Sequence, residues 1–279
     1  MVSRMPPAHR SDDLTVHRFG RTDADAPTLL LLHGLTDSGR CWPDAVARWQ
    51  DRYRLLAWDA RGHGASERFT ESELAAGVGE THLADVVDLL ESLRDEGTVP
   101  PVLVGLSMGG GTAAAVAGAR PELLRAVVLE DPVLGGDRFS EELAADLAEH
   151  RVAERQRALN DPEGTLAEGR REHPTWPEAE YGPWREAKLQ TDVGVLRDHT
   201  TTVLTPWPQV AAAVAVPALV VLGRQGIWSP EQMNQLHAVG NDRLEVHVVE
   251  DAGHCVRRDQ PDAFHALVDP WIAEQLDRP

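Results

Sequence analysis

Short apolar runs alternate in this chain with longer segments of helical periodicity, and this alternation limits the fold more than any other feature of the sequence. The runs are almost entirely apolar, which is typical of strands that helices cover on both faces. They lie at residues 28–32, 53–58, 102–104, 126–129, 218–222 and 244–249. The helical segments lie at 42–50, 81–95, 108–119, 230–239 and 262–276. We therefore expect an α/β fold with a doubly wound, mostly parallel sheet.

One long stretch interrupts this alternation. Between residues 133 and 209 the sequence contains no good strand candidate, and it is helix-like and rich in charge. We interpret this stretch as a helical insertion between two strands, lying over one end of the sheet.

The charge of the chain argues against two classes of partner. Its 27 basic and 45 acidic residues give a net charge of −18, which would repel nucleic acid and anionic lipid. The longest apolar stretch, residues 210–222, contains Pro217 and is too short to span a bilayer. The first residues lack an apolar signal-peptide segment, and the chain has only two cysteines, Cys41 and Cys255. We expect a cytoplasmic protein that binds neither nucleic acid nor membranes.

The segment Gly105-Leu106-Ser107-Met108-Gly109 has the pattern G-x-S-x-G. It lies between an expected strand and an expected helix, the context in which this pattern forms a sharp turn that exposes a nucleophilic serine. We predict that Ser107 is the nucleophile, with its hydroxyl near the positive end of the helix dipole. The alternative is a purely structural Gly-Ser turn.

Acyl transfer also requires two backbone N–H groups that bind the developing oxyanion. The apolar run at 28–32 ends in His33-Gly34-Leu35, where the chain turns. We predict that Leu35 N–H is one oxyanion donor and that Met108 N–H is the other. His33 could instead be a catalytic base, but we favour a role in bracing the loop.

A histidine after the last expected strand is the best candidate for the base. The chain has twelve histidines, and His254 lies in the loop Asp251-Ala252-Gly253-His254-Cys255, which follows the run 244–249. A histidine on such a loop can take the proton of Ser107 and return it to the leaving group. The order of serine before histidine along the chain fits this role.

These residues together resemble the α/β-hydrolase superfamily. The motifs that carry the resemblance are His33-Gly34, Asp59-Ala60-Arg61-Gly62-His63-Gly64-Ala65-Ser66, Gly105–Gly109 and Ala252-Gly253-His254. They occur in the order and at the spacing usual for the family, and the resemblance covers residues 14–276. It implies an eight-stranded sheet and identifies the insertion as the family's cap domain. The expected organisation is a first core part at 1–132, a helical cap at 133–209 and a second core part at 210–279.

The acid departs from the family pattern. The family usually has an Asp after its seventh strand, in G-x-x-D-x-x-x-P, but here Gly226 stands between Gly223 and Pro230 in the acid's position. Some members, including some dehalogenases and a group of fungal lactonases, place the acid at the end of the sixth strand instead. That strand is followed here by Glu130 and Asp131. By strand-end register we favour Glu130, with Asp131 as the alternative acid and a Ser–His dyad as a third arrangement.

Large aromatic residues are the candidates for the substrate pocket. Tryptophan suits a pocket for a flat apolar substrate, although each could instead pack the cap against the core. The candidates are Trp176, Trp184, Trp207 and Trp228. The sequence contains no motif for a metal or a phosphate-bearing cofactor, so we predict that no metal or cofactor is bound.

The sequence thus predicts a serine hydrolase, a carboxylesterase or lactonase, with Ser107, His254 and Glu130 as its triad and a small hydrophobic ester or lactone as its substrate. The alternatives are a hydrolase of carbon–carbon bonds in diketones, a cofactor-free perhydrolase, and a non-catalytic protein that binds a small molecule. The oligomeric state stays open, a homodimer being one arrangement that the sequence allows. Similar folds perform different reactions, so the fold does not identify the substrate.

Overall fold

The computed structural model describes residues 14–23, 25–135, 141–197 and 201–278. Its strands form one seven-stranded sheet in the order β1-β3-β2-β4-β5-β6-β7. They are β1 (Val16–Gly20), β2 (Thr28–Leu32), β3 (Arg54–Trp58), β4 (Val102–Leu106), β5 (Ala126–Glu130), β6 (Ala218–Gly223) and β7 (Leu244–Val249). β1 is antiparallel to β3, and every other neighbouring pair is parallel. The predicted fold class is confirmed, with seven strands in the described residues where the resemblance implied eight.

The burial of the strands explains why the sequence indicated most of them. β2, β4, β5 and β6 occupy the middle of the sheet and are buried at every residue, as strands covered on both faces must be. β1 lies at the edge and is only partly buried. Its sequence, Val-His-Arg-Phe-Gly, forms no apolar run, and the sequence analysis did not predict this strand.

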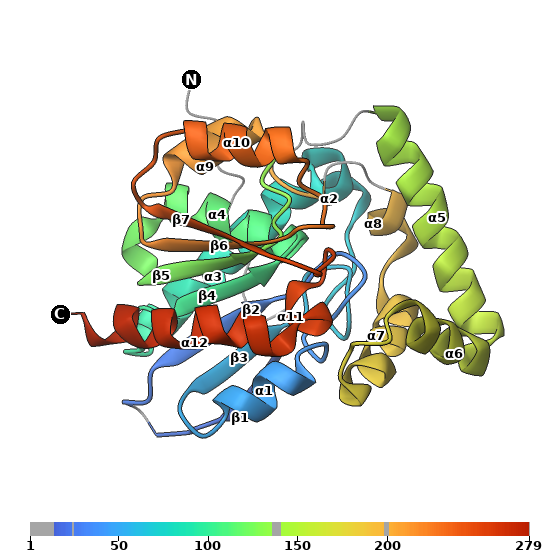
Figure 1. Ribbon diagram of the computed structural model, residues 1–279, viewed down its shortest axis with the longest axis horizontal. Helices are drawn as coiled ribbons and strands as arrows, with labels where there is room; N and C mark the ends of the chain where they lie inside the picture. Colours follow the sequence, from blue (N-terminus) through green and yellow to red (C-terminus); the bar gives the residue numbers. More distant parts are fainter. Residues whose placement is uncertain (1–13, 24, 136–140, 198–200, 279) are drawn as a thin grey trace.

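Helices cover both faces of the sheet (Figure 1). On one face lie α1 (Pro43–Trp49) and α12 (Pro261–Asp277); on the other lie α3 (Val78–Asp95), α4 (Met108–Ala119), α9 (Trp207–Ala213) and α10 (Pro230–Ala238). Each layer closes an apolar core of its own against the sheet. Trp49 and Phe264 are fully buried in the first core, and Val86 and Val116 are fully buried in the second. The shorter helices α2 (Glu71–Ala76) and α11 (Val256–Asp259) lie in loops.

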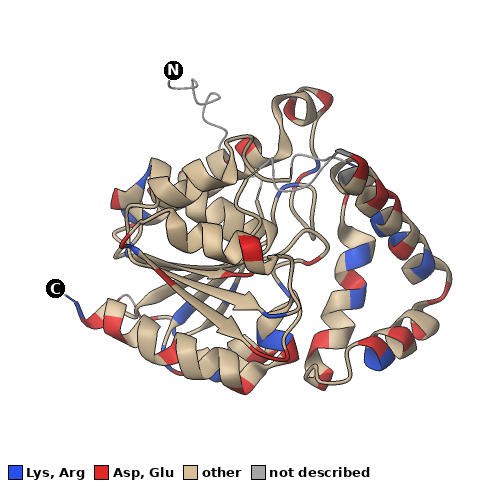
Figure 2. Ribbon diagram, turned by 45° about the horizontal axis from the view of Figure 1, so that its top comes forward, with Lys and Arg blue, Asp and Glu red and all other residues tan. Residues whose placement is uncertain are grey.

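Four helices pack together beside the sheet, and we call them the cap (Figure 1). They are α5 (Glu141–Asn160), α6 (Pro162–Glu172), α7 (Glu178–Gln190) and α8 (Val193–Arg197). Basic and acidic residues alternate along these helices (Figure 2), and the described part of residues 133–209 contains no strand. The last helix of this stretch, α9, packs against α4, so the boundary expected at residue 209 falls inside a helix of the core. Among the described residues, no helix combines the length and apolar character that crossing a bilayer requires.

Candidate active site

The turn between β4 and α4 holds Ser107 in a backbone conformation that residues with a side chain rarely adopt. Its φ is 56° and its ψ is −113°, and such strain persists only where the surroundings impose it. Ser107 N–H donates to the Glu130 carbonyl oxygen at 2.9 Å, and Val133 N–H donates to the Ser107 carbonyl oxygen at 3.0 Å. The end of the neighbouring strand β5 therefore holds the Ser107 backbone in place at the carboxyl edge of the sheet.

Glycines on both sides of Ser107 allow this turn. A Cβ at Gly105 would lie 2.4 Å from the carbonyl oxygen of Gly109, and a Cβ at Gly109 would lie 2.1 Å from the carbonyl oxygen of Leu32. Both distances are far below van der Waals contact, so neither position accepts a larger residue. The strand–turn–helix context expected for G-x-S-x-G is therefore present in the structure.

The loop after β2 lies against Ser107. A Cβ built on Gly34 would be 3.5 Å from the Ser107 Cβ, and Gly109 N–H donates to the His33 carbonyl oxygen at 3.2 Å. Within the described part of the chain, the N–H groups of Leu35 and Met108 donate no hydrogen bond to a protein acceptor. Both predicted oxyanion donors are therefore available to a ligand beside Ser107.

Two buried histidines hold this loop. His33 Nε2 accepts a hydrogen bond from Ala60 N–H at 3.0 Å, and its Nδ1 lies 2.8 Å from the Gly34 carbonyl oxygen. His63 Nε2 lies 2.7 Å from the carbonyl oxygen of Leu35. Burial lowers the pKa of both imidazoles and favours their neutral forms. With both ring nitrogens engaged, His33 acts as the brace that the sequence suggested.

A hydrogen bond joins His254 to a buried carboxylate at the end of β5. His254 Nδ1 donates to Asp131 Oδ2 at 2.7 Å, and Ile227 N–H donates to the same oxygen at 3.0 Å. Asp131 is fully buried, whereas the imidazole is about one third exposed (36%). This arrangement holds the proton on Nδ1 and leaves Nε2 able to accept one.

The preference for Glu130 as the partner of His254 was wrong, and the structure places the alternative, Asp131, in that position. The Glu130 side chain instead accepts a hydrogen bond from Arg257 N–H at 2.8 Å, and its other oxygen lies 3.5 Å from Arg257 Nε. Consecutive side chains of a strand point to opposite faces, and a φ of 37° at Asp131 then turns the chain as β5 ends. Counting residues along the strand could not predict this left-handed backbone conformation at Asp131. Burial also raises the pKa of Glu130 to about 7.

The unusual Gly226 is explained by the position of Asp131. A Cβ at Gly226 would lie 2.5 Å from Asp131 Oδ2 and 2.8 Å from Asp131 Cγ. The Asp131 carboxylate therefore occupies the space that a side chain at position 226 would enter. The absence of an acid at 226 and the presence of one at 131 are two aspects of the same arrangement.

The four predicted pocket tryptophans form two separate clusters. Trp207 and Trp228 meet edge to face with ring centroids 5.2 Å apart, and Trp228 Nε1 donates to the Pro132 carbonyl oxygen, directly after Asp131. Trp176 and Trp184 meet in the cap at 5.9 Å. The first pair lies beside the acid and the second lies in the cap, so the four do not line a single wall.

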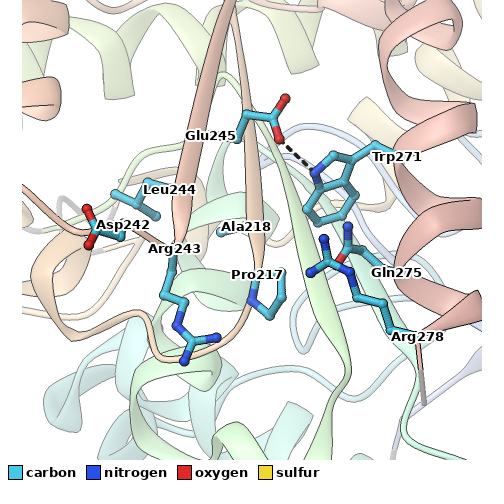
Figure 3. Close-up of a pocket in the computed structure, with 9 residues that line it drawn as sticks. All are labelled: Pro217, Ala218, Asp242, Arg243, Leu244, Glu245, Trp271, Gln275 and Arg278. Carbon is cyan, nitrogen blue, oxygen red and sulfur yellow. Dashed lines mark hydrogen bonds between the residues drawn. The ribbon is translucent and has the colours of Figure 1, made fainter.

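A hollow of about 470 Å³ lies at the opposite edge of the sheet (Figure 3). Pro217 and Ala218 at the start of β6 and Leu244 at the start of β7 line it, and the Trp271 indole donates to Glu245 beside it. The candidate catalytic groups follow the carboxyl ends of the strands, so this hollow is separate from their site. In the described ranges, no cluster of three or more His, Cys, Asp or Glu side chains is arranged to hold a metal.

The comparison with known families agrees with this fold and with this set of motifs. The profile described as the alpha/beta hydrolase family matches residues 29–267, which is most of the chain. The chain belongs to the alpha/beta hydrolase family. Its membership accounts for the serine turn after β4 and for the histidine loop after β7.

Similar proteins of this family are hydrolases. The chain is 28% identical over 265 residues to the sn-1-specific diacylglycerol lipase ABHD11 of Mus musculus, covering 90% of this chain and 82% of that protein. It is 29% identical over 273 residues to the lipase LipV of Mycobacterium tuberculosis, covering 92% and 96%. The crystal structure of the enol-lactonase from Burkholderia xenovorans LB400 superposes with a TM-score of 0.65 at 24% identity, covering 93% and 96%. These similarities support a hydrolase.

Proposed function

We propose that this alpha/beta hydrolase cleaves carboxylic esters or lactones through an acyl-enzyme on Ser107. The observation that carries the proposal is the hydrogen bond from His254 to Asp131 at the sheet edge where the strained Ser107 turn lies. A serine, a buried carboxylate and a histidine, in this order along the chain, have the chemistry of nucleophilic acyl transfer.

Each group has a defined role in the proposed reaction. His254 Nε2 takes the Ser107 hydroxyl proton as the oxygen attacks the carbonyl carbon, and Asp131 stabilises the imidazolium that forms. Leu35 and Met108 N–H groups bind the oxyanion. His254 then protonates the leaving alkoxide, and a water activated by the same imidazole releases the acid and restores Ser107.

The kinds of bond cleaved by the relatives support an ester or lactone as the substrate. Lipases act on carboxylic esters and an enol-lactonase acts on a cyclic one, and both reactions pass through the same tetrahedral oxyanion. Trp207 and Trp228 are both buried, so this pair supports the chain after Asp131 and does not present an exposed surface to a substrate. The negative charge of the chain favours a neutral substrate over an anionic one. We propose that the cap begins after residue 133 and ends before α9, which belongs to the core. We retain the prediction of a cytoplasmic location.

The test is hydrolysis of p-nitrophenyl acetate and of a panel of lactones by the wild type and by Ser107→Ala, together with labelling by a fluorophosphonate. We expect turnover and stoichiometric labelling in the wild type and neither in Ser107→Ala. Labelling that persists in Ser107→Ala would contradict the nucleophile. Tight ligand binding without turnover in the wild type would favour a binding protein instead.

A further inference from the structure

The loop that carries His254 is closed by a carboxylate just beyond it. Asp259, the last residue of α11, accepts a hydrogen bond from Gly253 N–H at 2.8 Å through Oδ2. Gly253 directly precedes His254, and α11 begins two residues after it. Asp259 therefore holds together the two ends of the segment that contains the histidine.

A cap side chain holds the other oxygen of this carboxylate. Trp176, which lies between α6 and α7, donates from Nε1 to Asp259 Oδ1 at 2.7 Å. The guanidinium of Arg258 packs over the Trp176 ring at 4.8 Å from its centroid. The indole is almost completely buried, so water does not compete for these contacts.

A second cap side chain holds α11 itself. Glu180 on α7 is fully buried, and its Oε2 accepts hydrogen bonds from Arg258 Nε at 2.8 Å and from Arg257 Nη1 at 3.2 Å. Its Oε1 accepts a weaker one from Asp44 N–H at 3.3 Å. Asp37, in the loop after β2, accepts from Arg258 Nη2 at 3.0 Å. The two arginines that follow the histidine are thus bound to the cap and to the core together.

The charges of this cluster allow Glu180 to be tested without trapping an unpaired ion. Three buried carboxylates, those of Asp37, Glu130 and Glu180, surround the two buried guanidinium groups of Arg257 and Arg258. Breaking a buried pair is costly when it leaves a charge uncompensated. At pH 8, above the raised pKa of Glu130, replacing Glu180 with glutamine leaves two charged carboxylates for the two guanidinium groups and keeps the side-chain shape.

We propose that Trp176 and Glu180 are positioning residues for His254, so that the packing of the cap against the core determines the position and orientation of the His254 imidazole. In the described structure, no hydrogen bond, ion pair or ring contact joins either side chain to the imidazole. Trp176 acts through Asp259 on the residue before it, and Glu180 acts through Arg257 and Arg258 on the helix after it. This inference rests on the proposed function, because it assigns His254 the role of the base.

The test uses Glu180→Gln and Trp176→Phe, each with a matched control in the cap. Glu178→Gln removes the same charge from the same helix, where Glu178 forms an exposed ion pair with Arg170. Thr165→Val removes a donor from a buried residue whose partner, the Asp161 carbonyl oxygen, lies at the start of α6, away from the Trp176 ring. We will measure kcat on p-nitrophenyl acetate and divide it by the concentration of active sites, which the burst phase gives. We expect this kcat to fall about 10- to 100-fold in Glu180→Gln and Trp176→Phe, because a small displacement of a catalytic base strongly lowers the rate. KM should change less than about threefold, and both controls should match the wild type.

Hydrogen exchange separates this inference from the proposed function. We expect amides 253–259 to exchange faster in Glu180→Gln and Trp176→Phe than in the wild type and the controls. Unchanged exchange, or a lower melting temperature with an unchanged kcat per site, would overturn the positioning role. Equal losses of kcat in the controls would overturn it as well. A wild type without Ser107-dependent hydrolysis would instead contradict the proposed function, and the exchange data would still decide whether the cap holds the loop.

Discussion

Two neighbouring carboxylates at the end of β5 lie in contrasting surroundings. Asp131 faces the imidazole of His254 and the amide of Ile227, without a guanidinium group among its hydrogen-bond partners in the described structure. Glu130 faces the opposite side, where Arg257 supplies both an amide and a charged side chain. Both carboxylates are fully buried.

The difference shows that the groups around a carboxylate, and not its burial or acidity alone, determine whether it is catalytic or structural. A carboxylate beside an imidazole stabilises the imidazolium that forms during proton transfer. Glu130 lies beside a permanent cation, but burial outweighs this attraction and raises the pKa of its carboxyl group, and its hydrogen bond to a helix amide makes it a structural group. The following predictions test this contrast.

The largest effect on activity is expected when the two carboxylates are substituted one at a time. Asp131→Asn should lower kcat on p-nitrophenyl acetate by about 10⁴, because an amide can hold the wrong imidazole tautomer and cannot balance its charge. Glu130→Gln should cost less than about tenfold, since the amide oxygen still accepts from Arg257 N–H. Steady-state kinetics with circular dichroism as the folding control will measure both. The reverse ranking would return the catalytic role to Glu130.

The pH dependence of stability should reveal the environment of Glu130. Burial raises its pKa from 4.5 to about 7, so the folded state favours the protonated form. The stabilisation that this shift gives the folded state is complete below pH 4.5 and is lost as the pH rises through 7. The free energy of unfolding should change by at most about 3 kcal/mol over this range. Urea unfolding of the wild type and of Glu130→Gln at several pH values will isolate it. Parallel curves for the two proteins would contradict this expectation.

A side chain at position 226 should disturb the Asp131 carboxylate. Gly226→Ala should lower the free energy of unfolding by about 1–3 kcal/mol, because its Cβ would collide with Asp131 Oδ2. Gly182→Ala, on the exposed face of α7, is the control: beyond its chain neighbours its Cβ meets nothing within 4 Å, and only the following Pro183 opposes it, so it should cost less than Gly226→Ala. An equal response of the two glycines in urea unfolding would show that the space at 226 is not filled.

Moving the carboxylate should restore part of the function. In an Asp131→Ala background, Gly226→Asp directs a carboxylate toward the vacated space and should raise kcat about tenfold, or about 1.4 kcal/mol of activation free energy. Gly226→Asn in the same background is the uncharged control and should give no gain. Equal kcat values for the two double variants would mean that position 226 does not reach His254.

The smallest effect is expected at the surface of the cap. Glu178 and Arg170 form an exposed pair, and exposed pairs contribute little because water and salt screen them. Glu178→Gln should therefore change the free energy of unfolding by at most about 0.5 kcal/mol, whereas Glu180→Gln should exceed this because Glu180 is buried between two guanidinium groups. Equal values for the two variants in urea unfolding would remove the contrast between surface and buried carboxylates.

Most of the sheet could be predicted because strands that are buried on both faces consist almost entirely of apolar residues. Five of the six predicted apolar runs overlap the inner strands β2 to β6; the sixth overlaps β7, which is apolar in sequence although it lies at the other edge of the sheet and is only partly buried. The edge strand β1 forms no apolar run, because it is only partly buried or exposed along its length and polar residues are tolerated there. Helix α9 shows a second limit of the sequence analysis. Its sequence adjoins the cap, and the expected boundary divides it, but in the structure it packs against α4 of the core.

The sequence by itself determined the parallel sheet, the serine turn and the histidine loop, because short-range sterics and strand burial act on consecutive residues. Tertiary structure alone decided which carboxylate meets His254, since that depends on a left-handed φ at Asp131 and on the space left by Gly226, 95 positions further along the chain. It also decided that Glu180 and Trp176 of the cap bind the loop of the histidine. Contacts between distant segments arise from packing in three dimensions, and a local pattern of residues does not encode them.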